Sequence, residues 1–339
     1  MPLRTPRVTI GLPVYNGENF LRLTLTSLLA QTYRDFEMVI SDNASADATE
    51  RICGEFAARD RRIRYCRATE NRGAIWNYNR VFDLSRGEYF MWASHDDLWA
   101  TTFLEKCVAA LDDDRRRVLA LPRVVIIDQH GCEIIADDAR RNNDYEVMTD
   151  EAFSGRRENL EHDSPSRRFF GVLVQTIRCQ EIYGLIRTDA LQRTGLHRPF
   201  ANSEKALIAE LALLGKIHEV PERLYFSRWH DARYSNSHDA NEKHEHFITG
   251  GRKRRFVWPH QPRCLAGYAT VAAKAPISPL EKLRCAMILA RFVAQPGRIG
   301  SVIRRMLRGT GMTVDIPDHA ATGQSVAAIT GVGPLAHTT

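Results

Sequence analysis

The segment Phe36-Glu37-Met38-Val39-Ile40-Ser41-Asp42-Asn43-Ala44-Ser45-Ala46-Asp47 joins an alternating, β-prone run directly to an acidic polar cluster. A second segment, Tyr89-Phe90-Met91-Trp92-Ala93-Ser94-His95-Asp96-Asp97, repeats this arrangement. In an open α/β sheet, the side chains that follow parallel strands converge on one crevice at the carboxyl ends of the strands. The two clusters are therefore predicted to share one ligand, and a nucleoside diphosphate held through a divalent cation suits their charge.

The runs around these two segments alternate between the spacing of strands and that of helices. Strands are predicted at 8–12, 36–40, 63–66 and 89–93, and helices at 21–29, 48–56, 75–84 and 102–111. Ser45 is expected to cap the second of these helices. The alternation of strand and helix predicts βαβ units, and therefore an α/β fold with a mostly parallel central sheet flanked by helices.

The second half of the chain follows this pattern less regularly. Strand-like runs occur at 118–121, 124–128, 181–186, 217–220 and 223–229, and Pro221 separates the last two. A helix is predicted at Glu204–Leu214, with its leucines on the inner face. Two polar segments, 142–165 and 230–246, are expected to form a loop and a flexible flap.

These patterns divide the chain into three parts. Residues 1–235 are expected to form one large domain, with a nucleotide-binding half at 1–128 and an acceptor half at 165–235. Residues 236–308 are expected to form a flap and a basic helical extension, with amphipathic stretches at 280–292 and 299–307. The tail, residues 309–339, has few large apolar residues and is predicted to be disordered.

Composition narrows the class of protein. The 339 residues carry a formal charge of +6, a mild bias toward anionic partners. The seven cysteines form no Cys-x-x-Cys pair, which argues against a disulfide framework or a zinc module and favours a reducing cytoplasm. The sequence shows neither an apolar signal core nor a run of about 20 apolar residues, so a cytoplasmic protein that does not span a membrane is predicted.

The acidic residues behind the strands suit metal and nucleotide chemistry. Mg²⁺ or Mn²⁺ in nucleotide sites takes only one or two protein carboxylates, so adjacent Asp96 and Asp97 suffice. Asp42, at the end of a neighbouring strand, is placed to accept a hydrogen bond from a base. The alternatives are structural: Asp97 as the cap of the next helix, and Asp42 as an Asx-turn residue.

Several motifs, taken in order, resemble family 2 glycosyltransferases of the GT-A fold. They are Ile10-Gly11-Leu12-Pro13-Val14-Tyr15-Asn16-Gly17, Ser27-Leu28-Leu29-Ala30-Gln31-Thr32-Tyr33, Asp42-Asn43-Ala44-Ser45-Ala46-Asp47-Ala48-Thr49, Asn71-x-Gly73 and Gly87-Glu88-Tyr89. Together these motifs extend over about residues 7 to 230.

The resemblance implies a GT-A type fold and a nucleotide-sugar site. Pro13, Tyr15, Asn16 and Asn71 are implied to line the nucleotide pocket, with Asp42 reading a uracil, guanine or thymine base. Ser94 to Asp97 is implied to be the family's D-x-D element, which contacts the diphosphate and a divalent cation. Ser94 stands where the first Asp of that element often lies, so the choice between Asp96 and Asp97 as the metal ligand stays open.

The resemblance also implies how catalysis would occur. Glu204, at a predicted helix start, is implied to be the general base of an inverting sugar transfer to a hydroxyl group. Arg228 is implied to approach the diphosphate and His230 the metal. The structural alternatives are a Glu favoured at that position by the helix dipole alone and a histidine that only ends a strand.

The acceptor is expected to be a growing cell-surface polysaccharide or a lipid-linked glycan at the inner face of the membrane. The basic run Arg252-Lys253-Arg254-Arg255, beside amphipathic stretches, fits peripheral contact with an anionic membrane, and fits a charged surface turn equally well. It lacks the interleaved aromatic residues and the module of a nucleic-acid protein, so no nucleic-acid partner is expected. His238, His244 and His246 are read as part of a solvated flap, not a zinc site.

Two rival functions are considered. A sugar-phosphate nucleotidyltransferase would need a glycine-rich triphosphate loop after the first strand, and Leu12-Pro13-Val14-Tyr15-Asn16 offers none. A nucleotide-sugar-binding scaffold whose catalytic activity has decayed is the non-enzymatic alternative, and Ser94 is the feature that raises it.

Overall fold

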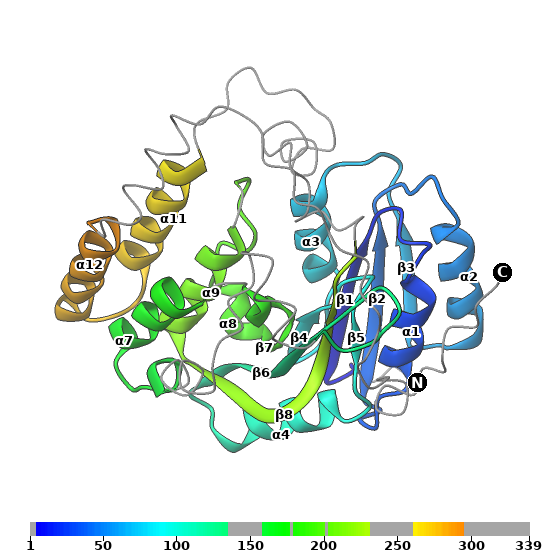
Figure 1. Ribbon diagram of the computed structural model, residues 1–339, viewed down its shortest axis with the longest axis horizontal. Coiled ribbons are helices and arrows are strands. Elements are labelled where there is room, and N and C mark those ends of the chain that lie inside the picture. Colours follow the sequence, from blue (N-terminus) through cyan, green and yellow to red (C-terminus); the bar gives the residue numbers. More distant parts are fainter. Residues whose placement is uncertain (1–4, 135–157, 177–178, 201–202, 231–259, 295–339) are drawn as a thin grey trace.

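The computed structural model describes residues 5–134, 158–176, 179–200, 203–230 and 260–294 (Figure 1). In these ranges eight strands form one mixed, curled sheet in the order β3-β2-β1-β4-β7-β6-β8-β5. The strands are β1 Val8–Val14, β2 Phe36–Asp42, β3 Ile63–Arg67, β4 Tyr89–Trp92, β5 Leu98–Trp99, β6 Arg117–Ile127, β7 Leu185–Arg187 and β8 Lys216–Arg228. The α/β fold with a central sheet flanked by helices is thus as predicted.

Helices follow most strands and pack around the sheet (Figure 1). The α-helices are α1 Leu21–Leu29, α2 Thr49–Arg59, α3 Ala74–Asp83, α4 Phe103–Asp113, α7 Pro165–Phe170, α8 Thr188–Gln192, α9 Ser203–Leu214, α11 His260–Lys274 and α12 Pro279–Val293. A π-helical turn, η1 Gly171–Gln175, and a 3-10 turn, η2 Gln180–Tyr183, connect α7 to β7. None of the described helices combines the length and apolar content that crossing a bilayer requires.

The first four strands form the parallel half of the sheet. β1 lies between β2 and β4, in a register that pairs Val14 with Asp42 and Gly11 with Trp92. All seven residues of β1 are buried, as expected for a parallel strand covered on both faces. Because the three strands are parallel, the segments that leave them emerge at one edge of the sheet, and both acidic clusters lie there.

The second half of the sheet brings the end of β8 to that same edge. β7 runs antiparallel to both β4 and β6, and β8 runs parallel to β6. The last pair of the β6–β8 ladder joins Ile127 to Arg228, while β5 pairs antiparallel with β8 through Leu98 and Phe226. The residues just after β4 therefore lie against the carboxyl end of a strand that follows them by about 130 positions.

The structure corrects the predicted break at Pro221. β8 is one strand of 13 residues, and β6 likewise is continuous through Pro122. The β6–β8 register passes from Pro122↔Val220 to Arg123↔Arg223, so Pro221 and Glu222 fall in a bulge. A bulge tolerates proline because the ladder there requires no hydrogen bond from its nitrogen.

Two further local predictions were wrong. The strand predicted at 181–186 is a 3-10 turn followed by the short β7. Between them Gly184 passes so close to Ala120 that a Cβ would lie 2.7 Å from its carbonyl oxygen. Ser45 does not cap α2, which begins at Thr49 without a side-chain cap. The Ser45 hydroxyl binds Asp42 instead.

Some predictions lie outside the described residues. These are most of the loop at 142–165, the flap after His230, the basic run 252–255, the stretch 299–307 and the tail 309–339. The predicted helical extension is described in part, as α11 and α12.

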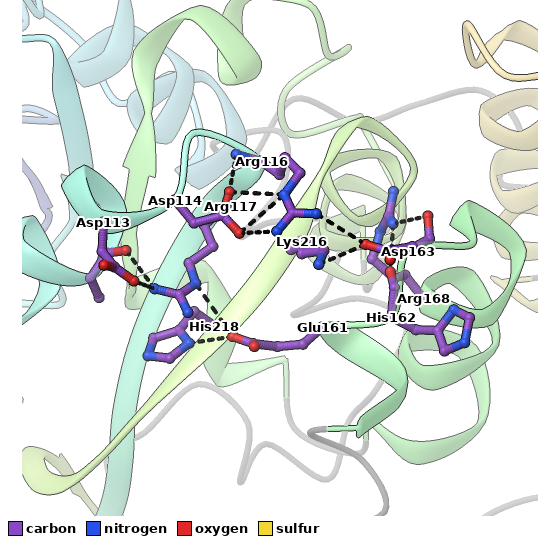
Figure 2. A network of polar contacts seen from close by, with 11 residues as sticks. Asp113, Asp114, Arg116, Arg117, Glu161, His162, Asp163, Arg168, Lys216 and His218 are labelled. Carbon is purple, nitrogen blue, oxygen red and sulfur yellow. Dashed lines mark hydrogen bonds and ion pairs between the residues drawn. The ribbon is translucent and has the colours of Figure 1, made fainter.

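A polar network joins the segment before α7 to the starts of β6 and β8 (Figure 2). The acidic clusters follow the ends of parallel strands, so they lie at the opposite edge of the sheet. Asp163 pairs with Arg116 at 3.4 Å and with Lys216 at 2.7 Å. Glu161 contacts His218 and lies 3.6 Å from the Arg117 guanidinium. This network holds the second half of the domain in place from the side away from the crevice.

A pair of glycine variants tests how tightly the parallel half is packed. A Cβ on Gly11 would lie 2.6 Å from the Phe90 ring and 3.0 Å from Val81, so Gly11→Ala should lower the free energy of unfolding by about 1–3 kcal/mol. Gly54, inside α2, has no atom within 4 Å of such a Cβ. Gly54→Ala should therefore stabilise the protein by about 0.5–1 kcal/mol. Urea unfolding compares the two, and equal effects would contradict this account of the packing.

Candidate active site

The loops that follow β1 and β2 are joined into one framework. Asn16, in the left-handed region with a φ of 51°, donates its backbone N–H to the Ser45 hydroxyl at 2.9 Å. The Asn16 side-chain oxygen accepts the Ala46 N–H at 2.9 Å, and the Gly17 N–H donates to the Thr49 hydroxyl at 2.9 Å. These bonds fix the position of one loop relative to the other, so the sheet edge presents a preformed surface.

Asp42 is the buried support of this framework. One carboxylate oxygen accepts the N–H and the hydroxyl of Ser45 at 2.8 and 2.6 Å, and the other accepts the Tyr65 hydroxyl at 2.6 Å. Arg67 lies 3.4 Å from the same carboxylate. Burial raises the pKa of Tyr65, and its bond to Asp42 adds to the rise. The side chain of Asp42 has no exposed surface and holds the loop after β2 in place. This matches the structural role considered from the sequence, in which Asp42 supports a turn and does not contact a base.

The other predicted nucleotide residues lie around Asp42. Pro13 is buried in β1 opposite Ser41, whereas Tyr15 and Asn16 are exposed. The Asn71 side-chain oxygen accepts hydrogen bonds from the Asn43 amide and the Gly73 N–H, both at 2.9 Å. Tyr15, 41% exposed, is therefore the large side chain of this group that is open to a ligand.

Asp97 is buried and bonded on every side. One carboxylate oxygen accepts the Arg228 N–H at 2.8 Å, and the other accepts the Tyr225 hydroxyl. Its backbone carbonyl accepts the Thr24 hydroxyl at 2.9 Å. Asp97 does not cap a helix, since α4 begins only at Phe103. It ties the loop after β4 to the end of β8 and to α1.

Asp96 has a different environment although it is the neighbouring residue. One carboxylate oxygen accepts the Ser94 hydroxyl, and the other lies 3.0 Å from Nε2 of His230. Its side chain and that of His230 are 11% and 9% exposed, so this pair keeps a small exposed surface, whereas Asp97 is 1% exposed. Ser94, at the position where the family resemblance would favour an Asp, orients Asp96.

Arg228 lies behind this pair. Its guanidinium donates to the carbonyls of Asp96 at 2.8 Å, Asp128 at 3.1 Å and Gln129 at 3.0 Å, and it stacks over the Phe20 ring. Burial lowers its pKa, against the opposing charges of Asp97 and Asp96. The side chain is 1% exposed, so Arg228 acts here as a clamp between the loop after β4 and the end of β6.

A layer of tyrosines connects the acidic cluster to α9. The Tyr78 and Tyr183 hydroxyls lie 3.4 Å apart, and the Tyr183 ring lies 5.8 Å from that of Tyr225, which binds Asp97. Burial raises the pKa of Tyr78 to about 12, and the nearby carboxylates of Asp96, Asp97 and Glu204 act in the same direction. Tyr78 is thus within electrostatic range of both the cluster and Glu204.

Glu204 carries a carboxyl group whose pKa is raised. It is the second residue of α9 and is partly buried, and no described side chain donates a hydrogen bond to its carboxylate. Burial raises its pKa, which the bond from its own backbone N–H offsets only in part. By contrast, Glu210 on the same helix is bonded to Arg198 at 2.7 Å and to the Gly195 N–H at 3.0 Å. A carboxyl group with a raised pKa is suited to proton transfer near neutral pH.

The structure thus brings the predicted nucleotide and metal residues to one edge of the sheet, and Glu204 on α9 lies within electrostatic range of Tyr78. Their binding and catalytic roles stay predictions. The sequence did not indicate three tyrosines of the site. Tyr65 and Tyr225 donate hydrogen bonds to Asp42 and Asp97, and Tyr78 contacts Tyr183. The Tyr225–Asp97 contact joins residues 128 positions apart, and no local pattern signals it. The acidic motif marks Asp97, but its partner becomes visible only in the fold.

The first part of the chain matches a known protein family. Residues 9–154 match the family model described as "Glycosyl transferase family 2". An uncharacterized glycosyltransferase of Rickettsia typhi is 33% identical over 139 residues, which are 40% of this chain and 42% of that protein. The putative teichuronic acid biosynthesis glycosyltransferase TuaG of Bacillus subtilis is 33% identical over 101 residues, 30% of this chain and 40% of TuaG. The chain thus matches less than half the length of these relatives.

Solved structures show the same fold. The crystal structure of S. aureus TarS 1–349 in complex with UDP-GlcNAc superimposes with a TM-score of 0.58 and 16% identity, over 85% of this chain and 71% of that one. At this identity the match establishes the GT-A architecture alone.

The two adjacent aspartates should respond differently to truncation. Asp97→Ala leaves the Tyr225 hydroxyl and the Arg228 N–H buried without their acceptor, and should lower the free energy of unfolding by about 2–4 kcal/mol. Asp96→Ala should cost less than about 1 kcal/mol, because water can reach the groups it leaves at the surface of the crevice. Denaturant unfolding of both variants measures the difference, and a larger loss for Asp96→Ala would refute the assignment of Asp97 as the support.

Proposed function

Because residues 9–154 belong to glycosyl transferase family 2, we propose that the protein transfers a sugar from a nucleoside diphosphate to a hydroxyl acceptor, with inversion at the anomeric carbon. The observation that carries the proposal is the Asp96–His230 pair, which reaches the crevice beside the loops of β1 and β2. Support for a catalytic function, beyond binding, comes from the Glu204 carboxyl group across the tyrosine layer.

The donor set fits a divalent cation shared with the substrate. Within the described residues, no group of three or more His, Cys, Asp or Glu side chains is arranged to hold a metal. A single protein carboxylate is enough when diphosphate oxygens complete the coordination of Mn²⁺ or Mg²⁺, and the His230 imidazole offers a further nitrogen ligand. Asp96 and His230 are the proposed ligands, and Asp97 is the support that holds Asp96. The cation, when bound, would neutralise charge on the departing diphosphate.

The nucleotide is proposed to lie over the loops of β1 and β2. Pro13, Asn16 and Asn71 frame this surface, and Tyr15 offers an exposed ring to a base. The Asp42 carboxylate is already bonded to Ser45 and Tyr65. Asp42 would therefore contribute to base recognition indirectly, by holding the loop after β2 on which the base lies. A uridine nucleotide is the first to test, since TarS, which has the same fold, was solved with UDP-GlcNAc.

Glu204 is proposed to accept the proton of the acceptor hydroxyl. As that oxygen bonds to the anomeric carbon, the bond from this carbon to the diphosphate oxygen breaks and its electron pair leaves with the diphosphate. A raised pKa makes Glu204 a stronger base than an ordinary carboxylate. The buried charge of Arg228 lies behind Asp96 and would act on the diphosphate only at longer range, while positioning Asp96 through its carbonyl.

The acceptor is proposed to be a cell-surface polysaccharide or a lipid-linked glycan, made on the cytoplasmic side of the membrane. Support comes from relatives such as TuaG, whose name places it in teichuronic acid biosynthesis. This activity is proposed for the whole chain, whereas the family model matches residues 9–154.

Replacing Glu204 tests the catalytic step. Glu204→Gln should lower donor turnover by about 10²- to 10⁴-fold while leaving the affinity for the nucleoside diphosphate within twofold, because the base acts only during transfer. In the wild type, the rate should rise with pH through the pKa of Glu204, at a higher pH than for an ordinary glutamate, because only the ionised form accepts a proton. Product release from UDP-, GDP- and TDP-sugars, followed across pH, gives both results.

The matched control is Glu210→Gln, on the same helix but bonded to Arg198 and away from the proposed chemistry. It should keep turnover within about threefold of the wild type. Loss of nucleotide affinity in Glu204→Gln, or an equal loss of turnover in both variants, would count against a general base. If the wild type binds a nucleotide but turns over none of the donors, the scaffold function would replace this proposal.

A further inference from the structure

Helix α12 has an inner face that packs on the protein. Cys285 is buried, and Ile288, Leu289 and Phe292 are partly buried against the core. Glu281 points inward, where it accepts the Ser166 N–H at 2.7 Å and the Ser164 hydroxyl at 2.9 Å. Burial opposes its ionisation, but these bonds and the Arg284 guanidinium outweigh burial and lower its pKa to about 2. These contacts of the inner face hold α12 against the rest of the protein.

The outer face of α12 is also apolar, and nothing in the described structure covers it. Leu280, Leu283 and Met287 are 57%, 58% and 52% exposed, and their spacing of three and four residues places them in one stripe. Ala290, one turn further, is exposed as well. Six large apolar side chains are exposed among the described residues, and four of them, including Val293, lie on this helix. Such clustering marks an interaction surface, since exposed apolar residues are otherwise scattered singly.

The stripe is bordered by positive charge. Arg284 and Arg291 are exposed and one heptad apart, so they lie on the same edge of the stripe. Arg284 is bonded to Glu281 at 2.6 Å, which leaves Arg291 as the cation of this edge that can bind a partner. The sequence from Lys282 to Val314 contains seven Lys and Arg residues and no Asp or Glu. The sole carboxylate of the helix, Glu281, is turned away from the stripe. An apolar stripe with cations along its edge is the pattern of a helix that lies in a membrane interface.

Helix α12 lies at one end of the described part of the molecule. Figure 1 shows α12 at the outer margin, beyond α11 and α7 and at the end opposite α2 and β3. The stripe on this helix is accessible, since Leu280, Leu283 and Met287 are each more than half exposed.

We propose that the outer face of α12 docks on an anionic lipid membrane. Leu280, Leu283 and Met287 enter the boundary between headgroups and acyl chains, and Arg291 pairs with a lipid phosphate. A second copy of the chain is the less favourable occupant, because pairing two such faces would bring their cationic edges together. The proposal is independent of the donor site, since none of these residues touches the crevice.

Sedimentation with lipid vesicles tests the proposal on the full-length chain. The wild type should bind vesicles that contain phosphatidylglycerol, bind pure phosphatidylcholine vesicles much more weakly, and lose affinity as salt is raised. Leu283→Glu/Met287→Glu should lower the partition coefficient on the anionic vesicles by at least about tenfold, because it places charge in the stripe. The control Ala269→Glu/Thr270→Glu adds the same charge at exposed positions of α11 and should keep most of the binding.

All variants replace exposed residues, so each should unfold at the temperature of the wild type and keep its donor turnover without vesicles. Vesicle binding that is unchanged in Leu283→Glu/Met287→Glu, or equally weakened in the control, would overturn the proposal. So would a lipid-free dimer, seen by light scattering, that the same double variant dissociates, because the stripe would then be covered by a second copy.

Discussion

The carboxylate of Asp97 is the constraint on which the geometry of the crevice depends. It accepts hydrogen bonds from the Tyr225 hydroxyl and the Arg228 N–H, and so joins the loop after β4 to the carboxyl end of β8. A buried carboxylate is stable only when its charge is met by donors, and here both oxygens have them. Since Asp96 is the next residue, fixing Asp97 fixes the backbone from which the Asp96 side chain projects, and Ser94 and His230 then orient its carboxylate.

The acidic residues of the site fall into two groups by environment. Asp42 and Asp97 are fully buried and bonded to tyrosine hydroxyls and backbone N–H groups, which suits residues that hold loops. Asp96 lies beside His230, and Glu204 is partly buried with its own backbone N–H as the donor and no described side-chain donor. The side chains of Asp96 and Glu204 keep some exposed surface, unlike those of Asp42 and Asp97, so the second group is where metal and proton chemistry are proposed.

Much of the parallel half of the fold can be predicted from the sequence. Alternation in Val8–Val14 and Phe36–Asp42, and the acidic clusters that follow Asp42 and Trp92, are enough to place both clusters at one edge. The antiparallel half is harder to predict, because Pro221 reads as a break and the bulge that absorbs it depends on pairing with β6. The sequence predicts Ser45 as a helix cap, and only the structure shows that its hydroxyl donates to Asp42 instead. The choice between Asp96 and Asp97 depends on Tyr225 and Arg228, which are distant in sequence.

The central claim is that Asp96 and His230 hold a divalent cation together with a nucleoside diphosphate, while Asp97 only supports them. Electron paramagnetic resonance of Mn²⁺ measures this directly, because the signal of the free ion falls as it is bound. The account predicts little binding by the protein alone, strong binding when UDP or another nucleoside diphosphate is added, and loss of the added binding in both Asp96→Asn and His230→Ala. Tight Mn²⁺ binding without nucleotide, or nucleotide-dependent binding that survives in both variants, would contradict it.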